Sequence, residues 1–286
     1  MTTLAKLDDE RMKHKLTAHV PKPWAEIINQ YLDYLRSAGI AETTIYTRRQ
    51  HLEFLARRIG MPPSEVTGET LIKWTGKQPW KREPRRGRTN TFKLFWRYAA
   101  KVGKLDNVAD DLPKVRAAAG IPRPAPDRVY MRGIMQADQR TRLILRLGAE
   151  IGLRRGEISR IHSNDLTEDL VGWSLLVHGK GNKQRTVPLT ASIAEDLQNL
   201  DYGYAFPGKI DGHLSARRVG ELAATALDDQ WTLHTLRHRF ATRTYSIDHD
   251  VFAVQTLLGH ASAETTRRYV QRDVGKLRDL VNRAAG

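Results

Sequence analysis

The run His234-Thr235-Leu236-Arg237-His238, followed by Gly259-His260 and then by Tyr269, carries the most information about fold and chemistry. His234 and Arg237 are three residues apart, so on a helix both side chains can reach one ligand. An arginine fork fits the oxygens of a phosphate, histidine exchanges protons near neutral pH, and tyrosine can act as a covalent nucleophile. The run therefore predicts a helix over residues 234–245 and phosphoryl transfer on a phosphodiester.

The composition around this run indicates a polyanionic partner. The chain has 286 residues, with 47 Lys+Arg against 32 Asp+Glu and a formal charge of +15. This charge is spread along the chain, whereas a membrane-surface protein concentrates it on one amphipathic helix, so nucleic acid is favoured. The chain contains no cysteine, which excludes a disulfide framework, a thiolate zinc site and a cysteine nucleophile.

The start of the chain lacks the features of a targeting segment. Residues 1–20 carry charges of both signs without the apolar centre of a signal peptide, and no later segment offers about 18 uninterrupted apolar residues. We therefore expect a soluble cytoplasmic protein, associated with the nucleoid and without a membrane partner.

Apolar spacing and prolines divide the chain into two domains. After a polar lead-in over residues 1–20, helical spacing predicts a small DNA-binding unit over residues 21–111. Its helices are expected from Trp24 to Gly39, over 42–59 and over 69–75, with a fourth that follows the basic stretch Lys81–Arg88 and fades at Gly103. Four prolines and three consecutive alanines predict a linker over residues 112–127.

The second domain, residues 128–286, is expected to be mostly helical with a small antiparallel hairpin or sheet. Alternation over residues 172–177 predicts a strand, residues 178–184 form a turn, and residues 185–189 return antiparallel, with Pro188 suited to an edge strand. The predicted fold is mainly α. Helices are predicted over residues 141–151, again after Glu157, and over 190–200, 215–227, 234–245, 250–258 and 262–270.

Five segments, in their order and spacing, resemble the motifs of the tyrosine recombinases, also called the phage integrase family. The resemblance covers nearly the whole chain, and the helical unit before the motifs looks like the family's core-binding domain. Residues 1–20 are shorter than the separate arm-binding domain of many phage integrases, so a simple type is implied. The five segments are Gly152-Leu153-Arg154-Arg155-Gly156-Glu157, Gly179-Lys180-Gly181-Asn182-Lys183-Gln184-Arg185, His234 to His238, Leu257-Leu258-Gly259-His260 and Tyr269.

The resemblance assigns roles to six catalytic residues. Arg154 and Arg237 would hold the non-bridging oxygens of the scissile phosphate, and their permanent charge would stabilise the transition state without metal or cofactor. Tyr269 would attack phosphorus and form a 3′-phosphotyrosyl bond. Lys180, on the hairpin tip, would protonate the leaving 5′-oxygen.

His234 and His260 would complete the catalytic set by assisting proton transfer and holding the phosphate. Glu157 is implied as an accessory residue that positions Arg154.

Each assignment has a plainer alternative. Arg154 could form a surface ion pair with Glu157, Tyr269 could be a packing residue, and Lys180 could be a solvated turn residue. His234 and His238 could form a metal pair, although the glutamate of a His-Glu-x-x-His motif and an obvious third ligand are missing.

Basic residues of the first domain are candidates for phosphate contacts, although such a run is more often a solvated face. If both domains clamp a duplex and neutralise six to ten phosphates, binding falls by about 10³–10⁵ between 50 and 200 mM salt. The candidates are Arg48, Arg49, Lys81, Arg82, Arg85, Arg86 and Arg88.

The expected protein is a site-specific DNA recombinase, and an integrase of a phage or mobile element is favoured. The resemblance implies double-stranded core sites, a homotetramer on two duplexes, a Holliday junction, a possible accessory directionality factor and a C-terminal segment over residues 275–285 that packs on a neighbour. The alternatives are a host recombinase that resolves chromosome dimers, a non-catalytic DNA-binding regulator and a metal-dependent nuclease.

Overall fold

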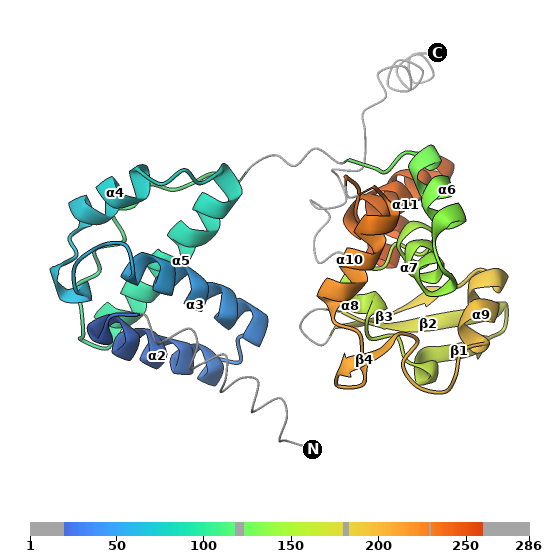
Figure 1. Ribbon diagram of the computed structural model, residues 1–286, viewed down its shortest axis with the longest axis horizontal. Helices are drawn as coiled ribbons and strands as arrows, with labels where there is room; N and C mark the ends of the chain where they lie inside the picture. The colour runs from blue at the N-terminus through green and yellow to red at the C-terminus, as the bar shows by residue number, and fades with distance from the viewer. Residues whose placement is uncertain (1–19, 118–122, 180–182, 229, 260–286) are drawn as a thin grey trace, which may run out of the picture. The chain divides into compact units, whose positions relative to one another are not determined.

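The computed structural model describes residues 20–117, 123–179, 183–228 and 230–259 (Figure 1). The chain forms two compact units, residues 1–119 and 120–286. It is mainly helical with one small antiparallel sheet, which confirms the predicted fold class. Within the described ranges, no helix is long and apolar enough to cross a membrane.

The first unit is a set of helices around an aromatic core. Trp24, Phe95 and Trp96 are fully buried, and the rings of Trp24 and Trp96 meet edge to face with centroids 5.8 Å apart. The Trp24 Nε1–H donates to the Met61 carbonyl at 2.8 Å, so its buried polar group is satisfied. The elements are α2 (Lys22–Ser37), α3 (Glu42–Ala56), η1 (Pro63–Glu65), α4 (Gly68–Gly76) and α5 (Arg82–Lys101).

The fourth helix of this unit starts earlier than predicted. The basic stretch was expected to precede it, but α5 begins at Arg82 and continues to Lys101. Glu83 and Pro84 favour a start here, because an acidic side chain complements the helix dipole and proline is tolerated in the first turn. The basic side chains therefore project from a helix.

The second unit contains a three-stranded antiparallel sheet in the order β1-β2-β3. Leu175 lies opposite Val187, and both side chains are buried. Pro188 lies on β3, which is an edge strand of the sheet, as predicted. The sheet consists of β1 (Leu166–Asp169), β2 (Gly172–His178) and β3 (Gln184–Pro188).

Four helices gather beside one another in the second unit (Figure 1). A Cβ on Gly148 of α7 would lie only 2.7 Å from Leu233 Cδ2, so α7 and α11 approach closely there. Leu233 and Leu236 are buried, and this packing fixes the face of α11 that carries Arg237. The four helices are α6 (Asp127–Gln136), α7 (Gln139–Ala149), α10 (Ala216–Ala226) and α11 (Leu233–Asp248).

The remaining elements include the largest departures from prediction. The helix expected after Glu157 is a single turn, because the Asp165 carboxylate and the His162 ring accept bonds from nearby backbone N–H groups and compete with helix formation. Helix α6 and strands β1 and β4 were not predicted, and the helix predicted over residues 262–270 lies outside the described residues. The remaining elements are α8 (Arg155–Ile158), η2 (Ser163–Asp165), α9 (Ala191–Gln198), β4 (Pro207–Ile210) and α12 (Val251–Leu258).

Candidate active site

Gly152 begins the segment that presents Arg154. Its φ is +72°, and a Cβ there would lie 2.4 Å from Phe240 Cδ1, so only glycine fits. Leu153 is fully buried, and the backbone N–H of Arg154 donates to Glu157 Oε2 at 2.9 Å. The Gly-Leu-Arg sequence therefore anchors Arg154 at the start of α8.

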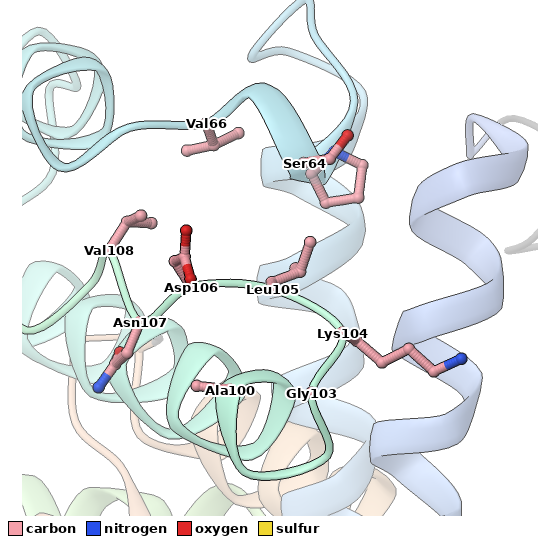
Figure 2. A pocket seen from close by; sticks show the side chains of 10 residues that line it. Ser64, Val66, Ala100, Gly103, Lys104, Leu105, Asp106, Asn107 and Val108 are labelled. Atoms are coloured by element: carbon pink, nitrogen blue, oxygen red, sulfur yellow. The ribbon is translucent and has the colours of Figure 1, made fainter.

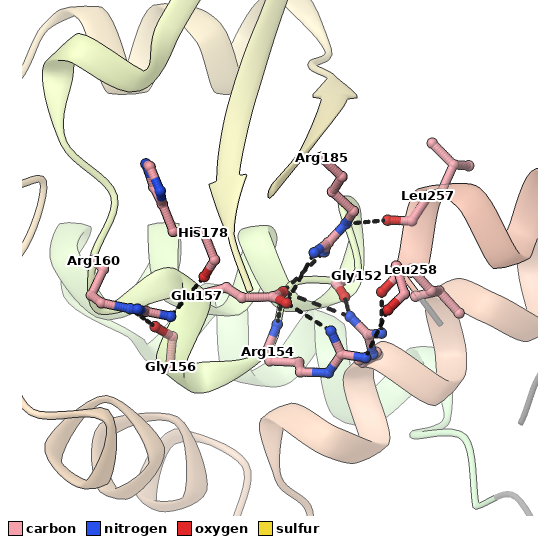
Figure 3. A network of polar contacts seen from close by, with 11 residues as sticks. Gly152, Arg154, Gly156, Glu157, Arg160, His178, Arg185, Leu257 and Leu258 are labelled. Atoms are coloured by element: carbon pink, nitrogen blue, oxygen red, sulfur yellow. Dashed lines mark hydrogen bonds and ion pairs between the residues drawn. The ribbon is translucent and has the colours of Figure 1, made fainter. Parts of the chain in front are cut away.

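The carboxylate of Glu157 lies at the centre of the site (Figure 3). It accepts from Arg154 Nη1 at 2.7 Å and from Arg185 Nη1 and Nη2, each at 2.9 Å. Arg237 Nη1 lies 3.8 Å from Glu157 Oε2. Three guanidinium charges around one carboxylate leave a formal surplus of two positive charges, which suits an anionic ligand.

These arginines keep the buried carboxylate ionised. Burial alone would raise the pKa of Glu157, but the hydrogen bonds and charges of Arg185 and Arg154 outweigh it and lower the pKa to about 2. Glu157 is therefore a hydrogen-bond acceptor at neutral pH, a state that suits positioning of arginines better than proton transfer.

Arg154 and Arg237 differ in accessibility. The Arg154 side chain is 43% exposed, whereas that of Arg237 is 3% exposed. Arg237 donates from Nη1 to the Gly152 carbonyl and from Nη2 to the Leu258 carbonyl, so it links α11 to the segment before α8 and to the end of α12. The structure brings the two predicted arginines together around Glu157, with Arg154 on the open side.

His234 and His238 form a hydrogen-bonded pair one turn apart on α11. The Arg123 backbone N–H donates to His238 Nδ1 at 3.0 Å, so a neutral His238 carries its proton on Nε2. That Nε2 lies 2.9 Å from His234 Nε2, which must then accept, leaving the His234 proton on Nδ1. Burial, followed by the charges of Arg237 and Arg154, lowers the pKa of His234 and favours this neutral form.

A metal site at His234 and His238 would need at least one further ligand. In the part of the chain that the structure describes, no three His, Cys, Asp or Glu side chains are grouped so that they could hold a metal ion. The two histidine Nε2 atoms face each other at hydrogen-bond distance.

Three predicted catalytic residues, Lys180, His260 and Tyr269, lie outside the described residues. Their flanks are described: the Gly179 N–H donates to the Lys183 carbonyl at 2.7 Å, and Gly259 ends α12 with a φ of +60°.

Three predicted DNA contacts of the first unit serve that unit's own fold. Arg49 is buried and forms an ion pair with Glu53 at 3.2 Å, so we no longer expect it to contact phosphate. Arg85 donates to the Thr75 and Gln78 carbonyls at 2.7 and 2.6 Å and so satisfies the end of α4. The Arg88 guanidinium lies 4.8 Å from the centroid of the Trp80 ring.

Three of the other four candidates are exposed. Lys81, Arg82 and Arg86 are exposed, and Arg86 pairs with Glu83 at 3.2 Å. Arg48 is half-buried and donates to the Tyr31 hydroxyl at 3.3 Å.

A pocket of about 390 Å³ lies between η1 and the loop that follows α5 (Figure 2). Its lining includes Ser64, Leu105 and Asn107, and none of the predicted site residues contributes to it. It is therefore separate from the candidate active site.

No role was predicted for Arg185, although it ends one of the quoted motifs. Its partner Glu157 is 28 positions earlier in the chain, a separation at which no helical or strand spacing predicts contact. The contact depends on the tertiary fold, which places β3 beside α8.

Comparison with known sequences identifies the family of the chain. The profile of the Phage integrase family matches residues 130–275. The chain is 30% identical to the tyrosine recombinase XerC of Neisseria meningitidis serogroup C (strain 053442), over 91% of this chain and 95% of that protein. It is 32% identical to XerC of Syntrophus aciditrophicus (strain SB), over 51% of this chain and only 53% of that protein.

Solved structures agree in fold. A lambda integrase dimer bound to a COC′ core site aligns with a TM-score of 0.69 at 18% identity, over 83% of this chain and 95% of that one. XerH bound to a difH substrate aligns with a TM-score of 0.67 at 19% identity, over 89% and 82% of the two chains. With the family profile and the full-length relative in agreement, the chain belongs to the phage integrase family of tyrosine recombinases.

Proposed function

We propose that the protein is a site-specific DNA recombinase that cleaves and rejoins strands through a 3′-phosphotyrosyl intermediate. The observation that carries this proposal is the cluster of Arg154, Arg185 and Arg237 around Glu157, which holds surplus positive charge beside an accessible guanidinium. Such preorganised charge stabilises a pentacoordinate phosphorane without a metal ion.

The proposed step exchanges one phosphate ester for another. The Tyr269 oxygen attacks phosphorus as the bond to the 5′-oxygen breaks, leaving a tyrosyl 3′-phosphate and a free 5′-hydroxyl. Lys180 gives a proton to the leaving oxygen, while His234 and His260 assist removal of the tyrosine proton and bind the phosphate. Attack by another 5′-hydroxyl reverses the step and joins the new strand.

The arrangement around Arg237 requires one local change when DNA binds. Arg237 is almost completely buried and donates to the carbonyls of Gly152 and Leu258. The phosphate takes the place of one of these acceptors, and the Leu258 carbonyl is the candidate because it lies at the end of α12, two residues before His260.

For DNA binding we propose a core-binding domain over residues 21–111, joined through residues 112–127 to a catalytic domain over residues 128–286. Lys81, Arg82 and Arg86 supply its phosphate contacts, since their side chains are exposed on or beside α5. The proposed assembly is a homotetramer on two duplexes, aided by the segment over residues 275–285 and in some reactions by a directionality factor.

Two biological roles fit this chemistry. Integration or excision of a phage or mobile element remains our first proposal. Resolution of host chromosome dimers is the second proposal. It is supported by the match over 95% of a bacterial XerC. DNA captured covalently from cells decides between them: an element's attachment junction supports the first role, and one fixed chromosomal locus in element-free cells supports the second.

The chemistry is tested first with sheared host and element DNA, and then with the core site that this DNA identifies, rebuilt as a nicked duplex. Wild type and Tyr269→Phe are incubated with each DNA in EDTA and analysed on a denaturing gel. We expect an adduct with wild type alone. Cleavage without an adduct that requires added metal would indicate a nuclease, and sequence-specific binding without cleavage would indicate a regulator.

A further inference from the structure

We propose that Arg185 is a positioning residue that holds three parts of the active site in one arrangement. This inference rests on the proposed function and assigns a role to a side chain outside the catalytic set. Arg185 lies on β3, directly after the hairpin turn that contains Lys180 in sequence.

The contacts of Arg185 connect three separate elements (Figure 3). Its Nη1 and Nη2 donate to the two oxygens of Glu157 at 2.9 Å each, and its Nε donates to the Leu257 carbonyl at 2.9 Å. The side chain is 13% exposed, so these bonds are largely shielded from water. One guanidinium thus ties the hairpin to α8 and to the end of α12.

The space beside Arg185 is fitted closely to its side chain. A Cβ on Gly259 would lie 2.8 Å from Arg185 Cδ and 3.0 Å from its Nη1, and the φ of +60° at this residue also favours glycine. Gly259 therefore allows the backbone before His260 to pass against the Arg185 side chain. The Gly-His motif and the hairpin motif meet at this contact.

Arg185 also balances the charge of Glu157. Arg185 bonds both oxygens of Glu157, and Arg154 also donates to Oε1. The negative charge of Glu157 is therefore shared between two arginines, so the carboxylate orients Arg154 without cancelling its full positive charge. Without Arg185, Arg154 and Arg237 would be the remaining charges beside Glu157. Arg154 would then be drawn toward the carboxylate and away from phosphate.

The bidentate geometry makes a specific demand on the side chain. A lysine supplies the charge, but it cannot contact both oxygens of Glu157 and the Leu257 carbonyl in this planar arrangement. We therefore expect Arg185→Lys to retain more activity than Arg185→Met and less than wild type.

The test measures binding and cleavage separately on the captured nicked duplex. We expect Arg185→Met to lower the single-turnover rate of adduct formation roughly 10- to 100-fold, as loss of an outer-shell partner typically does. The Kd should change by less than about threefold, because the exposed cations of the first unit that are proposed to contact the DNA backbone are unchanged. In the double variant with Glu157→Gln, the loss should not exceed that of the worse single variant, because Arg185 acts through Glu157.

Arg146→Met is the matched control. Arg146 has a similarly shielded side chain, 17% exposed, and bonds Glu150, Ser192 and Asp196. It should lower Tm yet leave the adduct rate of the folded protein at the wild-type value. A wild-type rate in Arg185→Met, or an equal loss in Arg146→Met at matched folded fraction, would overturn the proposal.

Hydrogen exchange tests the positioning role of Arg185 independently of the proposed recombinase function. If wild type forms no adduct, the proposed function fails, and exchange in residues 183–188 and 251–259 decides whether Arg185 holds the three elements. Faster exchange in Arg185→Met and wild-type exchange in Arg146→Met support the positioning role, and unchanged exchange in Arg185→Met overturns it.

Discussion

Arginines in the two units look alike in the sequence and are used differently in the structure. In the first unit, Arg49, Arg85 and Arg88 bind a buried carboxylate, two carbonyls and an aromatic ring of their own domain. In the second unit, Arg154, Arg185 and Arg237 surround one carboxylate and leave surplus charge. A basic residue therefore indicates a phosphate site only when its charge is not already used by the fold.

The largest expected effect separates Arg154 from Arg85. Arg154→Met should lower the adduct rate about 10²–10³-fold, as loss of a transition-state donor typically does. It should change Tm little, because the Arg154 side chain is partly exposed. Arg85→Met should leave the adduct rate of the folded protein unchanged. Single-turnover cleavage at matched folded fraction checks both, and equal losses would remove the distinction between the units.

Two of the buried carboxylates, Glu157 and Glu53, should respond to pH with opposite signs. The pKa of Glu157 is lowered from 4.5 to about 2, so its contribution of about 3 kcal/mol is present above pH 4.5 and is lost as pH falls toward 2. Burial raises the pKa of Glu53 despite Arg49 and Arg57, so ionised Glu53 costs stability as pH rises. The free energy of unfolding, measured with urea across pH, should fall less in acid for Glu157→Gln than for wild type. For Glu53→Gln it should fall in acid as it does for wild type. Identical pH profiles for all three proteins would contradict the predicted difference between Glu157 and Glu53.

Arg85 should matter for stability. Its hydrogen bonds to the Thr75 and Gln78 carbonyls hold the end of α4, and a charged donor is typically worth about 1.5–3 kcal/mol. Arg85→Met should lower the free energy of unfolding by about that amount. Arg82 is exposed, so Arg82→Met is the control. Its free energy of unfolding should fall by less than about 0.5 kcal/mol. Equal losses of unfolding free energy in the two variants, measured by chemical denaturation, would show that the hydrogen bonds of Arg85 do not stabilise the fold.

His238 should have a smaller effect on chemistry. It donates to His234 Nε2 and so fixes which His234 nitrogen carries the proton. His238→Phe should slow adduct formation by roughly 10-fold, less than the loss of a general acid or base itself. The profile of rate against pH should also change, because both histidines have lowered pKa values in the intact pair. An unchanged rate and profile would leave His238 as a packing residue.

The smallest effect concerns the exposed cations of the first unit. Lys81→Gln, Arg82→Gln and Arg86→Gln should each make the negative slope of log affinity against log salt about 0.9 shallower if the residue contacts a phosphate. Arg49→Gln is the buried comparison and should leave the slope unchanged. Binding titrations between 50 and 200 mM salt measure it, and equal slopes throughout would locate the DNA contacts elsewhere.

Much of the fold was predictable because local signals agree with it. The β2–β3 hairpin follows from its turn residues, and the helix predicted from residue 215 begins with Ser215 as its N-cap. Strand β1 was not predicted, since four mostly exposed residues show no alternation. Helix α6 was missed although Pro126 and Asp127 mark its start, because its short apolar face includes Gly133.

Only the site residues near one another in sequence could be related in advance. Arg154 with Glu157 and His234 with Arg237 follow from helical spacing, and the structure brings these two pairs together. Arg185 could not be assigned, because its contact with Glu157 depends on where β3 lies in the folded unit. Arg49 and Glu53 are four residues apart on a predicted helix, so spacing indicates their contact, but it does not indicate that both side chains are buried.

The central claim, that one phosphate is held by Arg154 and Arg237 around Glu157, is tested most directly by a structure of Tyr269→Phe bound to its captured duplex. We predict hydrogen bonds from both guanidinium groups to the scissile phosphate, with Arg185 still bidentate on Glu157 and the Leu258 carbonyl displaced from Arg237. A scissile phosphate bound elsewhere, with Arg237 still bonded to Gly152 and Leu258, would contradict the account.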